Sequence, residues 1–292
     1  MANLKEIRNR IVSISSTRQI TSAMKMVSAA KLRRAQDAIT QMRPYSKKLQ
    51  EILENLSAGL DSSEGVYSQE REVKNVLFVS ITANRGLCGG FNNNVIKTVK
   101  KIAETDYKNC EVTIVSIGKK SMDSFKLSPA AVKGKEVFSK SVEIIDNLTF
   151  DNVSEVAQLL MDQFAAKKQD KIVLVYNQFK NAAVQEIQVE QFLPVVPTVT
   201  EGATKSSAEY IFEPNKEFII EELIPKSLKT QLFKALLDSQ ASEHGARMTA
   251  MHKATDNATE LINELKLIYN KARQASITNE ILEIVAGAEA LN

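Results

Sequence analysis

The stretch MHKATDNATELINELKLIYNKARQASITNEILEIVA, residues 251–286, decides the fold that the sequence predicts. It belongs to a longer stretch, Lys226 to about Ala288, that contains no proline and only two glycines, Gly245 and Gly287. As one helix this stretch would be on the order of 90 Å long, which is more than a compact domain can bury. Apolar or small residues recur in it in steps of three and four, with Asn279 as the polar exception: Met251, Ala254, Ala258, Leu261, Leu265, Ile268, Ala272, Ala275, Leu282 and Ala286. This repeat is typical of a coiled-coil seam, so we expect the helix to pair closely with another helix.

A second long helix is predicted at the N-terminus, and it tolerates Pro44 as a kink or a local adjustment. One heptad frame fits the whole segment: Leu4, Ile7, Ile11, Ile14, Arg18, Thr21, Lys25, Ser28, Leu32, Ala35, Ile39, Met42, Ser46, Leu49, Leu53 and Leu56. The frame turns polar between Arg18 and Ser28, where apolar groups lie elsewhere around the helix: Ile20, Met24, Met26 and Val27. Either the supercoil has a stutter here, or this part of the helix contacts a third body.

The N-terminal segment is also basic. Met1 to Ser57 holds eleven Lys or Arg and four Asp or Glu, a net charge of +7, which leaves −4 for the remainder of a chain whose total is +3. This asymmetry predicts an acidic partner for the N-terminal helix. Lys31, Arg33 and Arg34 directly follow the polar part of the seam, so we expect carboxylates on the third body.

The composition is that of an ordinary globular protein, with 43% hydrophobic and 25% charged residues among 292. No run approaches about 18 apolar residues, and the N-terminus MANLKEIRNR has charges where a signal peptide has its apolar run. We therefore expect neither a membrane span nor export. The two cysteines, Cys88 and Cys110, lack metal-ligand spacing, and we expect both to be reduced thiols.

The middle of the sequence alternates between strand and helix patterns. Three short, β-branched runs are typical of strands buried on both faces: Asn75–Thr82, Glu111–Ile117 and Lys171–Tyr176. Helical patterns lie between them, at Asn92–Ala103 and Ser154–Lys167. The alternation predicts a small Rossmann-like α/β domain with parallel strands and right-handed crossovers, closed at one edge by a hairpin partner near Val184–Phe192.

The chain is therefore expected to have five segments: an N-terminal coiled-coil helix (1–57), a polar connector (58–74), the α/β domain (75–197), a linker with the start of the C-terminal helical region (198–225) and a C-terminal coiled-coil helix (226–292). A small domain that receives one long helix and emits another has its termini close together, so we expect antiparallel pairing. The end of the C-terminal helix is apolar around more than one face: Ile277, Ile281, Leu282, Ile284, Val285, Ala286 and Ala288. One partner helix covers only one stripe, so this tip is expected to need another apolar wall.

The loop ANRGLCGGFNNN, residues 83–94, lies between a strand and a helix, where phosphate-binding loops occur. Neither a Lys-Ser/Thr pair nor the GxGxxG spacing is present, so we interpret it as a tight turn. Gly86, Gly89 and Gly90 would supply positive φ or close approach in this structural glycine loop.

No catalytic or metal-binding arrangement stands out in the sequence. The middle domain contains no histidine to activate Cys88. His244 and His252 are too far apart for an i, i+4 metal pair, and we expect surface or interface histidines. We predict no cofactor and no metal.

Four blocks of residues are shared with one known family. They are RQITSAMKMVSAAKLRRAQ at 18–36, NRGLCGGFN at 84–92, SEHGARMTAM at 242–251, and a C-terminal set with ITNE at 277–280, Glu283 and GAEA at 287–290. The blocks span nearly the whole chain in the right order. On these residues the chain resembles the γ subunit of the F-type ATP synthases of bacteria, the central rotor shaft.

The resemblance implies a non-catalytic subunit of an ion-transporting two-sector ATPase. In the family, the antiparallel coiled coil stands inside a ring of three α and three β subunits, with its tip in an apolar sleeve. The globular domain sits on the membrane-embedded c ring and beside the ε subunit. Ion-driven rotation changes the state of each β subunit in turn, and the β subunits do the chemistry. The chain would be a monomer within the F1 complex, with no nucleic-acid partner and membrane association only through the complex.

Carried over residue by residue, the resemblance assigns three sets of contacts. An acidic lever segment of β would face Met24, Lys25, Lys31, Arg33 and Arg34, and a β loop would engage Arg273 and Gln274. The apolar bearing at the tip would comprise Ile281, Leu282, Ile284 and Val285. A foot that faces the c ring and ε would include Tyr210, Phe212 and Glu213.

The resemblance also implies a location. Plant chloroplast relatives carry a regulatory dithiol that has no counterpart here, and the sequence starts at Met1 without a transit peptide. We expect a peripheral protein on the cytoplasmic side of a bacterial inner membrane.

Two other classes stay open. A homodimeric coiled-coil scaffold would explain both helices, but it would favour a leucine-rich seam and would leave the tip uncovered. A nucleotide-binding enzyme would explain the sheet and the glycine loop, but it would need the missing phosphate signature.

Overall fold

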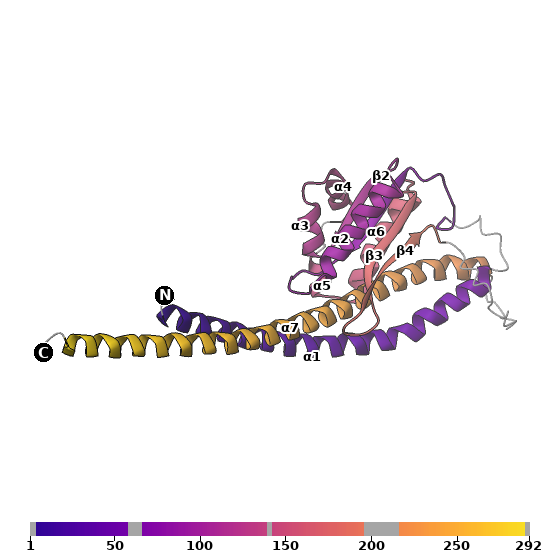
Figure 1. The fold of residues 1–292 in the computed structure, drawn as a ribbon. Helices are drawn as coiled ribbons and strands as arrows, with labels where there is room; N and C mark the ends of the chain where they lie inside the picture. Colours follow the sequence, from indigo (N-terminus) through magenta and orange to yellow (C-terminus); the bar gives the residue numbers. More distant parts are fainter. Residues whose placement is uncertain (1–3, 58–65, 139–141, 196–215, 290–292) are drawn as a thin grey trace. The chain divides into compact units, whose positions relative to one another are not determined.

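The computed structural model of the chain describes residues 4–57, 66–138, 142–195 and 216–289 (Figure 1). Its two longest elements are the helices α1 (Leu4–Ser57) and α7 (Lys216–Glu289). Between them lie, in chain order, β1 (Asn75–Ile81), α2 (Phe91–Thr105), β2 (Glu111–Ile117), α3 (Lys119–Phe125), α4 (Pro129–Val137), α5 (Glu143–Asp146), α6 (Phe150–Ala165), β3 (Lys171–Phe179) and β4 (Gln185–Leu193). The predicted class, an α/β domain between two long helices, is confirmed.

Contacts between residues divide the chain into two compact units. The helical unit, Met1–Ala29 with Arg247–Asn292, contains the first part of α1 and the last part of α7. The α/β unit, Ala30–Ala246, contains the strands, the shorter helices and the remaining parts of α1 and α7. Both long helices pass from one unit into the other without a break. The five sequence segments remain a proposed division of the chain.

The four strands form one sheet in the order β2-β1-β3-β4. β1 pairs in parallel with β2 and β3, and β4 pairs antiparallel with β3 at one edge. Residues 76–81 of β1 are all buried, as a central strand covered on both faces requires. The three predicted parallel strands and the hairpin partner are confirmed, and β3 runs on to Phe179.

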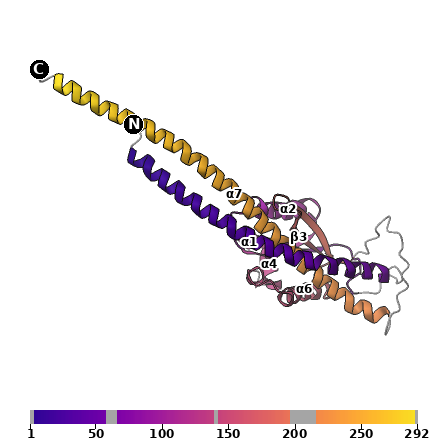
Figure 2. The same cartoon turned by 90° about the horizontal axis from the view of Figure 1, so that it is seen from below.

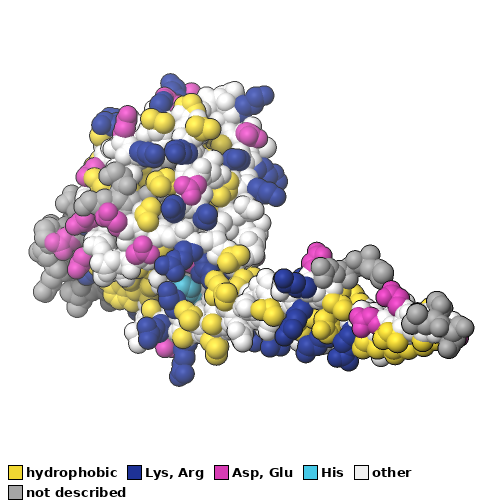
Figure 3. Space-filling view, turned by 90° about the vertical axis from the view of Figure 1, so that its left-hand side faces the viewer, with side chains coloured by type: hydrophobic (Ala, Val, Ile, Leu, Met, Phe, Trp, Pro, Cys, Tyr) yellow, Lys and Arg dark blue, Asp and Glu magenta, His cyan; other side chains and the backbone are white. Residues whose placement is uncertain are grey.

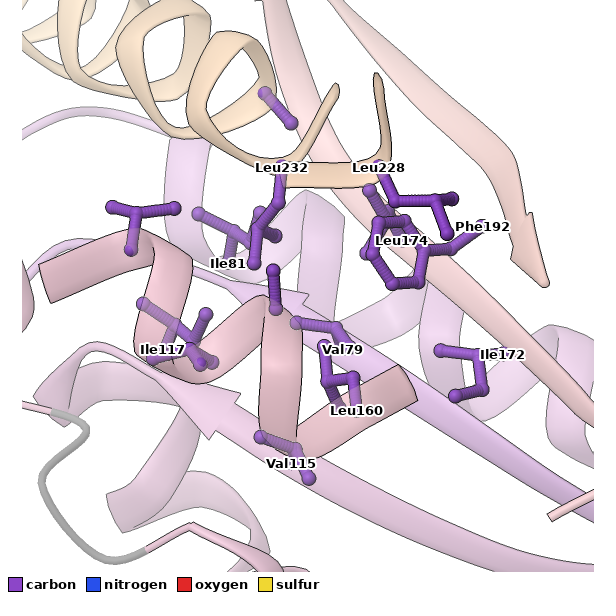
Figure 4. Close-up of a cluster of buried hydrophobic side chains, with 14 of the residues drawn as sticks. Val79, Ile81, Val115, Ile117, Leu160, Ile172, Leu174, Phe192, Leu228 and Leu232 are labelled. Atoms are coloured by element: carbon purple, nitrogen blue, oxygen red, sulfur yellow. The ribbon is translucent and has the colours of Figure 1, made fainter. Parts of the chain in front are cut away.

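A helical layer covers each face of the sheet. On one face α2 packs through Val95, Ile96 and Val99. On the other face α6 and the first part of α7 share a single core with the strands. In this core Leu228 of α7 lies against Leu174 and Phe192 of the sheet (Figure 4). The first part of α7 therefore packs in the core of the α/β domain. The sequence had predicted that the helix belongs to a coiled coil from Lys226 onward.

Three short helices between β2 and α6 were not expected from the sequence. The longest of them, α4, packs so closely on β2 that a Cβ at Gly134 would lie 1.8 Å from the carbonyl oxygen of Ile114. Glycine is required at this position because any side chain atom would overlap the strand. A glycine inside a helical segment can indicate that another part of the backbone approaches it closely. The sequence pattern alone does not say which part of the backbone this is.

The predicted seam of α1 is confirmed as far as Leu49, and the side chains of its last two members, Leu53 and Leu56, lie outside the described residues. From Leu4 to Leu49 every position of the heptad frame is buried or half-buried, and Pro44 lies inside the helix. The frame continues unbroken through Arg18 and Ser28, so the alternative of a stutter is wrong. Thr21 on this polar part of the seam has its hydroxyl 2.9 Å from the hydroxyl of Thr255 on α7.

The predicted seam of α7 is wrong at five positions, of which Leu282 and Ala286 lie in the fully exposed end of the helix. Leu261 and Ile268 are 37% and 49% exposed, and Ala275 is also exposed. Beyond Ala258 the covered series runs through Ile262, Leu265, Tyr269, Ala272 and Ser276, and it shares only Leu265 and Ala272 with the predicted seam. Both series advance by three and four residues, and at 261–262 and 268–269 two apolar residues stand side by side. Periodicity alone could not choose between them.

The two long helices run antiparallel, as expected. Within the helical unit, where Thr21 lies beside Thr255, the first part of α1 and the last part of α7 run in opposite directions (Figures 1 and 2). Within the helical unit α7 continues past the first turn of α1 (Figures 1 and 2).

Candidate functional site

The predicted β-subunit contacts near the N-terminus all lie on α1. Met24 and Lys25 are half-buried, whereas Lys31, Arg33 and Arg34 are exposed. Within the part of the chain that the structure describes, these four cationic side chains form no hydrogen bond or ion pair. Cationic groups that have no partner in their own chain are suited to receive carboxylates of another protein.

Apolar residues of the same part of α1 are exposed. Ile20, Met26 and Val27 are each more than half exposed. In the space-filling view, hydrophobic side chains appear at the surface of the helical pair with Lys and Arg side chains beside them (Figure 3). In the polar seam Thr21 contacts Thr255 and Ser28 Oγ donates to the Met24 carbonyl, so the exposed apolar residues beside the seam are what favours contact with a third body.

Arg273 and Gln274 are exposed on α7, next to the half-buried Ala272 of the seam. Among the described residues neither side chain has a hydrogen-bond or ion-pair partner. Their amide and guanidinium groups are free for directional contacts outside the chain.

The predicted bearing is exposed in full. All residues from Ile277 to Glu289 are exposed, and Leu282 and Ile284 are 60% and 71% accessible. The other two predicted members, Ile281 and Val285, are about half exposed. The tip thus presents large apolar side chains on several sides of one helix, as expected from its sequence.

The glycine loop departs from the expectation in its details. Gly89 has a positive φ of 59°, but the second positive φ, 60°, belongs to Leu87. Gly90 is the N-cap of α2 in an ordinary helical conformation, and a Cβ there would lie 3.2 Å from the Asn94 amide. A Cβ at Gly86 would meet only the end of a lysine side chain, at 3.9 Å. Positive φ is therefore required at Gly89, close approach favours glycine at Gly90, and neither reason applies to Gly86.

Three asparagines hold the glycine loop in place. Asn92 Oδ1 accepts from the Ala83 N–H at 2.9 Å, and Asn84 joins the loop to the Lys119 N–H and to the Val142 carbonyl. Asn177 donates to the carbonyl of Phe91 at 3.2 Å. Ala83, Cys88 and Phe91 also pack on Ala246 of α7. The loop is thus a structural joint between the sheet and α7.

Sequence reasoning missed a set of polar contacts where the β3–β4 hairpin meets the long helices. Arg43 Nη2 of α1 lies 3.3 Å from Asp238 Oδ1 of α7 and 3.2 Å from the carbonyl oxygen of Phe179. The Asp238 side chain is fully buried. These residues are 195 and 136 positions apart from Arg43, so no local pattern could have joined them.

Burial sets the ionisation of the groups in this region. It raises the pKa of the Asp238 carboxyl above its ordinary value, although Arg43 and Lys234 oppose the shift. It also raises the pKa of the Tyr176 hydroxyl, and the charge of Glu190 adds to the effect. Tyr176 therefore stays protonated and donates to Glu190 at 2.7 Å.

The remaining predictions have plain outcomes. Cys88 and Cys110 are free thiols, and His252 lies exposed 3.2 Å from Asp256. The foot residues Tyr210, Phe212 and Glu213 lie outside the described residues. In the described ranges we find no group of three or more His, Cys, Asp or Glu that could hold a metal ion. Within the same ranges no helix has the length and apolar content to cross a membrane.

Comparison with known proteins identifies the family. A family model described as ATP synthase matches residues 3–291. The ATP synthase gamma chain of Flavobacterium psychrophilum is 61% identical over 299 residues, covering 100% of this chain and 99% of its own length. That of Christiangramia forsetii is 62% identical over 293 residues, with both chains fully covered. The chain belongs to the ATP synthase gamma-chain family.

Solved structures of ATP synthases share the fold of this gamma-chain family member. In the rotor of the Euglena gracilis mitochondrial ATP synthase, a chain with 22% identity matches with a TM-score of 0.63, covering 94% of this chain and 98% of its own. In a second Euglena gracilis structure, of OSCP, F1 and the c ring, the TM-score is 0.65 at 21% identity, covering 99% and 94%.

Proposed function

We propose that this chain is the central rotor shaft of a bacterial F-type ATP synthase. In this role it couples ion-driven rotation of a c ring to conformational change, and to ATP synthesis or hydrolysis, in the β subunits. One observation supports the proposal most directly: α7 ends in residues 277–289, all exposed, with large apolar side chains on several sides. An end of this kind needs an apolar housing, and a sleeve formed by α and β subunits would supply one.

The basic and apolar surface of α1 supports contact with β. Lys25, Lys31, Arg33 and Arg34 would face an acidic segment of β, and Met24 would pack beside it. Arg273 and Gln274 would add directional hydrogen bonds at particular rotational angles. A shaft that drives β from one state to another must bind those states unequally. A hundredfold preference corresponds to about 2.7 kcal/mol of differential interaction.

The remaining assignments complete the proposed assembly. The chain would be a non-catalytic monomer among three α and three β subunits, with the chemistry carried out by β. Its foot, including Tyr210, Phe212 and Glu213, would contact the c ring and ε. The complex would place the chain on the cytoplasmic side of the bacterial inner membrane, associated with the membrane only through its partners.

Reconstitution tests this function. The full chain is mixed with α and β subunits, and complex formation and ATP hydrolysis are measured. The wild-type chain is expected to enter an active complex that depends on it. Ile284→Asp is expected to weaken assembly, because it puts a charge into the apolar sleeve. Asn270→Asp, which adds the same charge at an exposed polar position of α7, is the matched control and should assemble normally.

Two results would overturn the proposal. One is a chain that stays apart from α and β and forms a stable dimer, which would favour the coiled-coil scaffold. The other is an Ile284→Asp variant that assembles and works as well as Asn270→Asp, which would mean that the tip has no apolar housing.

A further inference from the structure

The first part of α7 meets the sheet largely through apolar side chains, including Leu228, Leu232 and Leu236. Apolar contact is non-directional. Apolar contact opposes separation of α7 from the sheet, but it does not by itself fix the position of the helix along the sheet. A shaft that transmits load needs contacts that fix this position.

Hydrogen bonds between α7 and the β3–β4 hairpin are directional and can fix the position of the hairpin along the helix. Ser242 Oγ donates to the carbonyl oxygen of Asn177 on β3 at 3.0 Å. On β4, Gln231 Nε2 donates to Glu190 Oε1 at 2.7 Å and to the carbonyl oxygen of Gln191 at 3.2 Å. These bonds are spaced along α7, so each strand of the hairpin is held at a defined position on the helix.

Arg43 extends this arrangement to α1. Its Nη2 lies within hydrogen-bond distance of both the Phe179 carbonyl on β3 and Asp238 Oδ1 on α7. Nearby, a Cβ at Gly245 of α7 would lie 3.3 Å from the backbone of Ala182, so the hairpin turn abuts the helix closely. One guanidinium thus joins three segments of the α/β unit.

We infer that Arg43 and Asp238 are positioning residues that lock the β3–β4 hairpin to both long helices, so that load on the α/β domain turns the shaft instead of shifting the domain along it. The inference rests on the rotor function proposed above. It adds the residues that would carry load from the domain into α1 and α7.

The contact between Arg43 and Asp238 is poorly suited to a purely stabilising role. The Asp238 side chain is 0% exposed, and its Oδ2 has no hydrogen-bond partner among the described residues. Burial raises the pKa of this carboxyl even with Arg43 in contact, so the desolvation penalty exceeds the attraction. What the pair does provide is a charge-assisted contact with a fixed direction.

The test measures how firmly the domain is coupled to the shaft. A complex of α, β and this chain is immobilised through β and held in one nucleotide state. A bead is attached to the α/β domain at residue 108, an exposed position, by Lys108→Cys in a Cys110→Ser background. The variance of the bead angle then reports the compliance between domain and tip.

Arg43→Met is expected to raise the angular variance clearly, because both of its contacts are lost. Asp238→Asn keeps an acceptor for Arg43 but removes the charge, so a smaller rise is expected. Arg43→Lys should fall between wild type and Arg43→Met, since an ammonium lacks the planar fork of the guanidinium. Lys180→Met is the matched control, because its ion pair with Glu186, at 2.6 Å, stays within the hairpin.

ATP hydrolysis without load should be unchanged in all four variants. This measurement separates the rotor function from the positioning role of Arg43 and Asp238. If the wild-type chain forms no active complex, the rotor function fails. If the complexes are active and Arg43→Met has the same angular variance as Lys180→Met, the positioning role is overturned. Should Arg43→Met fail to assemble, the comparison of Asp238→Asn and Arg43→Lys with wild type decides the question by the same criterion.

Discussion

Two leucines on the same helix are expected to respond very differently to the same change. Leu232 of α7 is 0% exposed in the core shared with the sheet, close to Ile81 (Figure 4), whereas Leu282 near the end of α7 is 60% exposed. Leu232→Ala removes three buried carbon atoms, at about 0.8 kcal/mol each, and leaves a cavity, so unfolding should become easier by about 3 kcal/mol. Leu282→Ala should change the stability of the isolated chain by about 0.5 kcal/mol or less.

Urea unfolding of the isolated full chain measures both effects. The chain has no tryptophan, so tyrosine emission is the probe, and Tyr176 lies in the same core as Leu232. A lower midpoint with an unchanged slope identifies a change in stability. Equal midpoints for the two variants would refute the reasoning, because they would mean that the first part of α7 is as free as its end.

Other predictions concern single contacts. Met24→Lys adds a charge at the proposed contact with acidic β residues, and it should lower ATP-driven ion transport more than assembly; equal losses would mark a structural effect. Arg273→Ala should slow ATP turnover of the complex while circular dichroism of the isolated chain stays unchanged; wild-type synthesis and hydrolysis would count against its role. Gly134→Ala forces a Cβ onto the carbonyl oxygen of Ile114, so the midpoint of urea unfolding should fall by the equivalent of about 3 kcal/mol, despite the gain of about 1 kcal/mol in helix propensity. The folded chain holds a proton on Asp238 to higher pH than the unfolded chain, so this group should make stability fall as pH rises from about 4 through its raised pKa. Asp238→Asn should remove that fall and be at least as stable as wild type at about pH 7, and a midpoint well below wild type there would contradict this.

The sequence was sufficient for those parts of the fold that follow a repeat. The α1 frame holds from Leu4 to Leu49 because each turn places one covered residue on the same side. The strands were recognisable because β1 is buried on both faces and so carries a continuous apolar run. On α7 the same logic failed at Leu261 and Ile268, because each has an apolar neighbour one residue further on and the repeat fits either.

Other features depend on contacts that no local pattern encodes. The need for glycine at 134 comes from the backbone of β2, and the position of Arg43 comes from residues more than a hundred positions away. The first part of α7 was assigned to the coiled-coil helix because the stretch from Lys226 lacks proline, but its apolar residues face the sheet. The basic surface of α1 and the apolar tip of α7 were predicted from charge and periodicity, the partners of individual residues came from resemblance to a family, and the exposure of these residues is what the structure adds. Their partners remain proposals.

Direct observation of rotation tests the central claim. A complex of α, β and this chain is fixed to a surface through β, and a bead on the α/β domain of the chain is followed under a microscope while ATP is hydrolysed. The rotor function predicts that the bead turns continuously in one direction and stops when ATP is removed. An active complex in which the bead stays at one angle throughout hydrolysis would contradict it.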